Sequence, residues 1–353
     1  MLVQTMWKDR LSFDDLGGGA GTALVGRINA LAAMGCGLLR FAVPDLQSAE
    51  ILGALAAMVS MPLCADVHFD YKIALRCLDF PIAKLRINPG NIGSRSRVEA
   101  VLAKAAEKKR PIRIGVNAGS LPQDIRKKVD GGMDTAEALV EAAERELAIF
   151  RECAFTDVLV SMKASGIADT IKANRLLSER TDAPLHIGLT EAGPLVRGSV
   201  RNTAALIPLL ADGIGDTVRV SLSDTVENEV IAAREILSAA AECAGDGGGR
   251  LRRQGANIVS CPRCGRCGFD THAFAGRWLQ RLYSLDKNIS VAIMGCEVNG
   301  PGEARHADIG ITGAGSAVLI FRRGAVIRRV DAAAGAAAAV DAAFGEELEK
   351  LCD

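Results

Sequence analysis

The chain has 353 residues, of which 49% are hydrophobic and 24% charged, so its composition excludes bulk disorder and predicts one large barrel with an appendage, or two domains. Its 42 Lys and Arg residues balance 42 Asp and Glu residues, and this formal net charge of zero argues against a general nucleic-acid binder. The longest uncharged stretch, Ile51–Ala65, is too short to span a bilayer, and the N-terminus shows no secretory signal. We therefore expect a cytoplasmic protein with no membrane or nucleic-acid partner.

The first two-thirds of the chain repeats a short β-branched run followed by an Ala- and Leu-rich helical stretch. Strands alternating with helices predict an α/β fold with a parallel sheet, and eight units within residues 1–243 match the size of a (βα)8 TIM barrel. An open doubly wound sheet is the alternative, although no strand leads into a dinucleotide-type glycine fingerprint. Gly17–Gly21 is expected to be a flexible loop. The predicted strands are Leu2–Thr5, Leu38–Val43, Leu63–Phe69, Lys84–Asn88, Ile112–Asn117, Val158–Lys163, Leu185–Thr190 and Thr217–Leu222.

A glycine-rich run at residues 244–250 predicts a linker, because it suits neither a helix nor a strand. Beyond it the pattern changes, and residues 250–353 are expected to form a small α+β domain. Helices are predicted at Asp270–Leu285 and, from high helix propensity, at Ala332–Leu351. The predicted strands of this domain are Asn257–Ser260, Ser290–Met294, Asp308–Thr312, Ala317–Phe321 and Val326–Val330.

Five of the eight barrel strands place a basic residue near the same end, where barrel enzymes carry their active sites. Converging cations repel one another and lose hydration unless an anion lies between them. Arginine forks match phosphate oxygens, so the pattern favours a small phosphorylated substrate, most simply a diphosphate; pairing of each cation with a local carboxylate is the alternative. The basic residues are Arg40, Arg86, Arg113, Lys163 and Arg219, and other polar residues at these strand ends are His68, Asn117, Glu191 and Ser221.

Four of the ten cysteines are grouped in the C-terminal region. Cys261 and Cys264 have the spacing at which two thiolates of one loop bind one metal centre, and Cys296 is a candidate third ligand. Glu303 lies where a returning loop could add a carboxylate. Three thiolates with one carboxylate are unusual for structural zinc and favour an iron–sulfur cluster, with zinc as the alternative. Cys267 extends the spacing towards a bacterial ferredoxin pattern, which fails because residue 271 is threonine.

Several longer motifs occur in order between Val3 and Ile311. They are residues 65–72 (ADVHFDYK), 85–93 (LRINPGNIG), 112–120 (IRIGVNAGS), 190–193, 213–217, 219–222, 260–264 and 296–303 (CEVNGPGE). Together these motifs resemble those of the bacterial 4-hydroxy-3-methylbut-2-enyl diphosphate synthase family. The chain departs from that family at Trp7–Arg10, where a Thr-Asn-Thr stretch is usual, and in having Cys267.

The resemblance implies an N-terminal TIM barrel and a C-terminal [4Fe-4S] domain similar to part of sulfite and nitrite reductases. It implies reductive ring opening and dehydroxylation of 2-C-methyl-D-erythritol 2,4-cyclodiphosphate to 4-hydroxy-3-methylbut-2-enyl diphosphate in isoprenoid biosynthesis. Reduced ferredoxin or flavodoxin would supply the electrons, and the family works as a homodimer. Two other classes remain open: a non-redox sugar-phosphate barrel enzyme with a structural zinc domain, and an iron- or redox-sensing protein built on an inactive barrel.

The resemblance also assigns residues. Cys261, Cys264 and Cys296 match the thiolate ligands of the cluster, and Glu303 matches a carboxylate ligand with a catalytic role. Glu191 matches a catalytic acidic residue that faces the substrate carbons. The positions that match substrate-binding residues or their neighbours at the mouth are Arg40, His68, Arg86, Arg113, Asn117, Lys163, Arg219 and Ser221.

Overall fold

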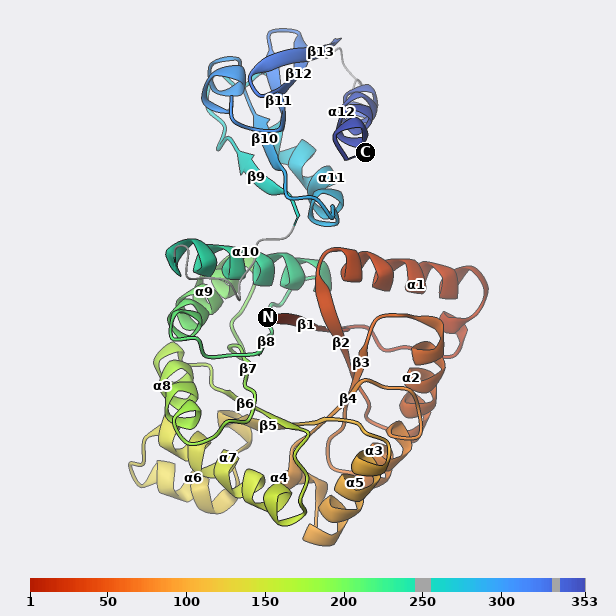
Figure 1. The fold of residues 1–353 in the computed structure, drawn as a ribbon, viewed down its shortest axis with the longest axis vertical. Coiled ribbons are helices and arrows are strands. Elements are labelled where there is room, and N and C mark those ends of the chain that lie inside the picture. The colour runs from red at the N-terminus through yellow and green to blue at the C-terminus, as the bar shows by residue number, and fades with distance from the viewer. Residues whose placement is uncertain (245–254, 332–336, 353) are drawn as a thin grey trace. The chain divides into compact units, whose positions relative to one another are not determined.

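The computed structural model describes residues 1–244, 255–331 and 337–352 (Figure 1), without the side chains of Pro89, Asn299, Pro301 and Glu303. The chain divides into two compact units, Met1–Arg252 and Arg253–Asp353. The predicted linker lies outside the described residues except for Ala244, which is the last residue of a helix. No helix in the described ranges combines the length and the apolar character needed to cross a membrane.

The first unit is a barrel of parallel strands, seen as a ring in Figure 1. The hydrogen-bonded order is β6-β5-β4-β3-β2-β1-β8-β7, and an isolated parallel bridge between Val160 and Leu185 joins β6 to the segment that leads into β7. All eight predicted strands are present, so the TIM-barrel prediction is confirmed and the open-sheet alternative is wrong. The strands are β1 (Leu2–Met6), β2 (Cys36–Ala42), β3 (Leu63–Asp66), β4 (Lys84–Ile87), β5 (Ile112–Asn117), β6 (Val158–Lys163), β7 (His186–Ile187) and β8 (Thr217–Val218).

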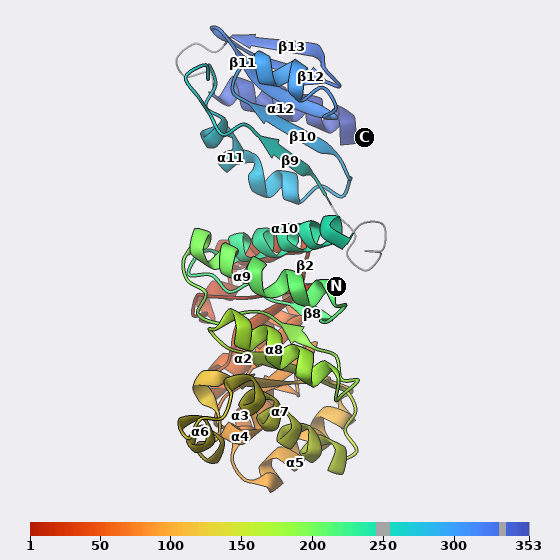
Figure 2. The ribbon, with the colours of Figure 1, turned by 90° about the vertical axis from the view of Figure 1, so that its left-hand side faces the viewer.

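Helices cover the outside of this barrel, and Figure 2 shows α8, α9 and α10 side by side along one flank. Strands β3 and β4 are buried along their whole length, as expected for a parallel sheet lined with helices. The carboxylates of Asp45 and Asp134 accept hydrogen bonds from backbone N–H groups at the starts of α2 and α7 and so fix where these helices begin. The helices are α1 (Gly18–Ala33), α2 (Leu46–Met58), α3 (Tyr71–Cys77), α4 (Pro89–Ile92), α5 (Arg95–Glu107), α6 (Gln123–Asp130), α7 (Thr135–Glu152), α8 (Ile167–Ser178), α9 (Leu195–Ala211) and α10 (Val226–Ala244).

Two local predictions for the barrel need correction. The glycine run predicted as a flexible loop begins helix α1, because Leu24, Ile28 and Leu31 bury one face of that helix and tertiary packing overrides the low helix propensity of glycine. Strands β7 and β8 are shorter than predicted, with two residues each. The chain beyond them still continues to the barrel mouth, where the Arg219 N–H donates to the Ile187 carbonyl at 3.0 Å.

The second unit is a five-stranded mixed sheet with order β13-β12-β11-β10-β9, in which β9, β10 and β11 are parallel and β11, β12 and β13 antiparallel. Helices α11 and α12 pack together through Phe274, Trp278 and Phe344 in the core shared with the sheet. The predicted final helix begins at Ala337, and residues 332–336 lie outside the described residues. The elements are β9 (Asn257–Ser260), α11 (Thr271–Tyr283), β10 (Ser290–Met294), a π-helical turn (Val298–Glu303), β11 (Ile309–Ala314), β12 (Ala317–Arg322), β13 (Ala325–Asp331) and α12 (Ala337–Cys352).

Candidate functional site

The carboxyl ends of the barrel strands surround a small cavity of about 160 Å³. All eight sequence-predicted substrate-binding residues line it, although they are spread along the chain from Arg40 to Ser221. The remaining lining residues are Asp66, Ser161 and Thr190. The complete set is Arg40, Asp66, His68, Arg86, Arg113, Asn117, Ser161, Lys163, Thr190, Arg219 and Ser221. The structure thus brings the predicted residues together, while their binding roles stay predictions.

Arg113 on β5 lies deepest among the cations, with 1% of its surface exposed. Its Nη1 donates to Ser161 Oγ at 3.1 Å, but Nε and Nη2 have no hydrogen-bond partner among the described residues. Burial, together with the charges of Arg40 and Arg86, holds the pKa of Arg113 well below its ordinary value. Buried guanidinium donors without partners are destabilising, and an anion with several acceptor oxygens would satisfy them.

Lys163 at the end of β6 is also buried. Its Nζ lies 3.3 Å from Nε2 of His186, whose Nδ1 lies 2.7 Å from Thr217 Oγ1. Burial, followed by the charges of Arg113 and Arg219, lowers the pKa of Lys163 well below its ordinary value. If Nδ1 of His186 carries the proton and donates to Thr217, Nε2 accepts from Lys163 and holds the ammonium in place.

Asp66 is the one acidic residue among those lining the cavity. It lies 2.9 Å from Nη1 of Arg86 and 3.6 Å from Nε of Arg40. Burial raises its pKa, but the hydrogen bond with His68 and the charges of the two arginines outweigh burial and hold the pKa of Asp66 well below its usual range. One carboxylate therefore holds two arginines in place. The lining of the cavity contains five basic residues and one acidic residue.

Glu229, in the first turn of α10, is a second buried carboxylate with several partners. It is 1% exposed and accepts from Arg219 Nη2 at 3.2 Å, from Thr5 Oγ1 at 2.6 Å and from the Leu222 N–H at 3.0 Å. Lys8 Nζ lies 3.1 Å from the same carboxylate. Burial opposes ionisation, but the charge of Arg219 and these hydrogen bonds hold the pKa of Glu229 below its ordinary value. Glu229 therefore holds Arg219, which lines the cavity.

Glu146 on α7 is a buried acid beneath the loop after β4. It accepts a hydrogen bond from the backbone of Gly90, while its Oε2 has no partner among the described residues. Burial raises the pKa of Glu146 to about 7. Gly90 belongs to the short helix α4, so Glu146 supports the backbone directly after β4.

Sequence reasoning missed Glu229, His186 and Glu146 because each acts through another residue. His186 is a single polar residue in an apolar strand, and this feature of the sequence could have marked it as a supporting residue. Glu191, predicted to be catalytic, is exposed with a backbone φ of +54°, and it lines neither this cavity nor the larger one beside it. Its neighbour Thr190 does line the smaller cavity, and the role of Glu191 stays a prediction.

The predicted cluster ligands lie on two loops that adjoin at the ends of β9 and β10. The Cys261 N–H donates to the Ile293 carbonyl at 2.9 Å, and the Gly268 N–H donates to the Gly295 carbonyl at 2.9 Å, so backbone hydrogen bonds link the loop 261–268 to the residues just before Cys296. Cys264 is exposed and Cys296 is buried. All ten cysteines are thiols without disulfides.

The ligand set is not assembled around one point. Among the described residues no group of three or more His, Cys, Asp and Glu side chains lies close enough to hold a metal ion, and the side chain of Glu303 lies outside the described part. Three thiols on adjoining loops nevertheless fit the donor chemistry of an iron–sulfur cluster. The Cys267 thiol donates to the Phe269 carbonyl at 2.8 Å, a contact that ties it to the backbone.

These features define a TIM-barrel protein with a barrel mouth lined by five basic residues and a separate cysteine-bearing unit. The chain belongs to the GcpE family: residues 2–234 match the GcpE TIM-barrel domain and residues 257–343 match the GcpE protein C-terminal domain. The resemblance seen in the sequence motifs is thereby confirmed.

Curated relatives extend over nearly the whole chain. The protein of Treponema pallidum (strain Nichols) is 51% identical over 361 residues, covering 99% of this chain and 86% of the relative. That of Treponema denticola is 48% identical over 373 residues, covering 99% and 93%. That of Geobacter sulfurreducens is 47% identical over 329 residues, covering 93% and 89%. Each is named 4-hydroxy-3-methylbut-2-en-1-yl diphosphate synthase (flavodoxin).

Proposed function

We propose that this protein is an oxidoreductase that makes 4-hydroxy-3-methylbut-2-enyl diphosphate by reductive ring opening of 2-C-methyl-D-erythritol 2,4-cyclodiphosphate. The observation that carries the proposal is the buried cation cluster in the barrel mouth, with five basic residues against one acid. A cyclic diphosphate supplies the negative charge and the acceptor oxygens that this cluster lacks. The names of the relatives and their near-complete coverage support the same substrate class.

Within this site the cations differ in how far they are already occupied. Arg40 and Arg86 pair with Asp66 and each keeps one nitrogen, Nε, without a hydrogen-bond partner among the described residues, whereas Arg113 keeps two such nitrogens. Arg113 and Lys163 therefore have the most to gain from an incoming phosphate. Arg219, which pairs with Glu229, contacts the diphosphate from the chain directly after β8. These contacts orient the diphosphate and so fix the position of the carbon skeleton above it.

Cys261, Cys264 and Cys296 would hold a [4Fe-4S] cluster, with Glu303 as the fourth ligand. Such a cluster supplies single electrons for the reduction. The protein contributes the ligands, the orientation of the substrate and its electrostatic hold. Glu191 is the candidate acid beside the substrate carbons, since it directly follows the cavity-lining Thr190.

Reduced flavodoxin is the proposed electron donor, as the names of the relatives indicate, with ferredoxin as the alternative. A homodimer is proposed from the family resemblance. The ten thiols are typical of a reducing compartment, which supports a cytoplasmic location.

Metal analysis and turnover of anaerobically purified protein test the proposal. We expect iron and labile sulfide together with reduction of the cyclodiphosphate by reduced flavodoxin. Zinc without labile sulfide would instead support a non-redox barrel enzyme. A cluster without cyclodiphosphate binding, measured by calorimetry, would support a sensor.

A matched pair of lysine variants tests the anion site directly. Lys163→Met should weaken cyclodiphosphate binding about 10- to 150-fold, because a charge-assisted contact contributes roughly 1.5–3 kcal/mol. Lys172→Met is the control, since Lys172 pairs with Asp134 on the outside of the barrel. Equal affinities of the two variants would overturn the proposed role of the mouth.

A further inference from the structure

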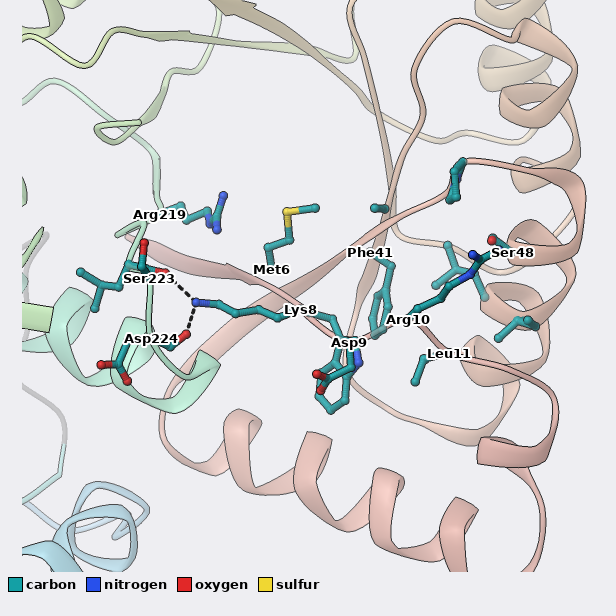
Figure 3. A pocket seen from close by; sticks show the side chains of 16 residues that line it. Met6, Lys8, Asp9, Arg10, Leu11, Phe41, Ser48, Arg219, Ser223 and Asp224 are labelled. Atoms are coloured by element: carbon teal, nitrogen blue, oxygen red, sulfur yellow. Dashed lines mark hydrogen bonds between the residues drawn. The ribbon is translucent and has the colours of Figure 1, made fainter. Parts of the chain in front are cut away.

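A second and larger cavity, of about 660 Å³, lies beside the cation cluster (Figure 3). Its walls come from the loop after β1, the end of β2, the start of α2 and the loop after β8. The volume falls in the range of small-molecule sites, about 300–1,000 Å³. The cation cavity, at about 160 Å³, has room for little beyond the anion itself.

The two cavities share a wall. Arg219 lines both of them. Arg40 lines the cation cavity and donates through Nη2 to the sulfur of Met6 at 2.9 Å, and Met6 lines the larger cavity. Figure 3 shows Arg219 and Met6 facing the same space. A molecule whose anionic group lies among the cations would therefore have to pass Arg219 to reach the second cavity.

The inner wall of the second cavity is apolar and well fixed. Phe41, Leu52 and Leu222 are each no more than 7% exposed. The Trp7 ring stacks on Phe41 with 5.8 Å between centroids, and Trp7 Nε1 is buried without a partner among the described residues. This wall offers hydrocarbon contacts and one unused donor, a combination typical of ligand sites rather than of packed cores.

Charged side chains at the rim are already paired. Lys8 donates to the carbonyl of Leu222 at 2.7 Å and to the carbonyl of Asp224 (Figure 3). Its Nζ also lies 3.1 Å from the carboxylate of Glu229. Arg10 lies 3.4 Å from Asp45. Because these charged groups have partners, the apolar inner wall favours a largely hydrocarbon occupant, although such an occupant leaves Trp7 Nε1 without a partner.

We propose that the larger cavity is a second subsite, which accepts the hydrocarbon chain of an organic diphosphate whose phosphates occupy the cation cluster. The ligand class is an alkyl or alkenyl diphosphate with a chain longer than that of the five-carbon product. Such a molecule takes the place of the substrate diphosphate and inhibits the enzyme competitively. The inference rests on the proposed anion site and adds a ligand beyond the proposed reaction.

Calorimetry on the full chain with inorganic pyrophosphate, butyl diphosphate and octyl diphosphate tests this subsite. Saturated chains contain no group for the enzyme to reduce, so the measurement reports binding alone. Octyl diphosphate should bind at least tenfold more tightly than butyl diphosphate, a difference of about 1.4 kcal/mol. It should also raise KM for the cyclodiphosphate without changing kcat.

Ala42 provides a variant that fills the cavity from its edge. It lines the cavity and is exposed at the end of β2, so a larger side chain there disturbs no core packing. Ala42→Phe should abolish the higher affinity for octyl diphosphate over butyl diphosphate. Its affinity for pyrophosphate should stay within twofold of that of the wild-type protein. Ala42→Ser is the control and should keep the gain.

The outcomes separate the two proposals. If pyrophosphate binds but octyl diphosphate binds no more tightly than butyl diphosphate, the second subsite is overturned and the anion site stands. A cavity filled by a second copy of the chain would give this result. If Ala42→Phe keeps the full octyl gain, the chain lies elsewhere and the subsite is again overturned. If no diphosphate binds, the anion site fails, and the subsite fails with it.

Discussion

Replacing Arg113 by leucine should make the ligand-free protein more stable while removing its hold on the diphosphate. Arg113 is 1% exposed, has two nitrogens without partners among the described residues and is surrounded by other cations. Leucine removes the charge and the unsatisfied donors and keeps an apolar side chain in the barrel interior.

The magnitude follows from the burial of the charge. Replacing buried charged groups by apolar residues is often stabilising by about 1–4 kcal/mol. The shorter leucine packs imperfectly, which reduces this gain in stability by about 1 kcal/mol. We therefore expect a net gain of up to about 3 kcal/mol. For a unit of this size the gain corresponds to a rise in Tm of up to about 12 °C.

Thermal unfolding with and without pyrophosphate provides the assay. The wild-type protein at a hundredfold excess over Kd should gain about 2.7 kcal/mol from the anion, whereas Arg113→Leu should gain little. Arg175→Leu is the control, because Arg175 pairs with Asp212 on the exposed side of α8 and should respond like the wild type. A lower Tm of ligand-free Arg113→Leu, or full stabilisation of that variant by pyrophosphate, would refute the reasoning.

Further outcomes follow from the cysteines and the buried acids. Serine at each predicted thiolate ligand should remove iron and turnover together, whereas Cys267→Ser should keep both; full iron content in any ligand variant would contradict its assignment. The ligand variants are Cys261→Ser, Cys264→Ser and Cys296→Ser. Glu303→Cys should keep iron and lose turnover, because thiolate holds iron more firmly than carboxylate does, and wild-type turnover would exclude an exchangeable role. Glu229→Gln should raise KM for the cyclodiphosphate about tenfold with kcat within threefold, and an unchanged KM would show that Glu229 does not position the phosphate-facing arginine. Glu146→Gln should be more stable than the wild type at pH 8 by up to about 3 kcal/mol. The pKa of Glu146 is about 7 in the folded protein, which is above its value in the unfolded chain. The stability of the wild-type protein therefore falls as pH rises from the unfolded pKa to about 7. Denaturant melts that give the same stability difference between Glu146→Gln and the wild type at pH 5 and pH 8 would contradict this assignment.

The barrel and its mouth could be predicted because both depend on local pattern. Each strand is a short apolar run, and parallel strands deliver their carboxyl ends to one place, so residues as distant as Arg40 and Arg219 were expected together. The same logic placed the cysteines on loops after β9 and β10. Strand ends and loop spacing carry this information without knowledge of side-chain packing.

Supporting residues were beyond prediction because their contacts cross the fold. Glu229 is one of two acids in the first turn of α10, and helical periodicity does not say which of them faces Arg219. The start of α1 was missed because packing of Leu24 and Ile28 outweighed four nearby glycines. The cavity beside Trp7 depends on three separate loops, which no single segment of sequence specifies.

Two glycines shape the interior of the barrel. A Cβ at Gly115 would lie 2.4 Å from Nε of Arg86, and a Cβ at Gly188 would lie 2.9 Å from Nζ of Lys163 and 2.3 Å from the Arg219 carbonyl oxygen. In most such barrels bulky branched side chains fill these layers. Here the guanidinium group of Arg86 and the ammonium group of Lys163 occupy the room that the glycines leave. A single methyl group added at either glycine would therefore displace one of these charged groups from its place in the cavity wall, although the added carbon would lie on a different segment of the chain from the cation.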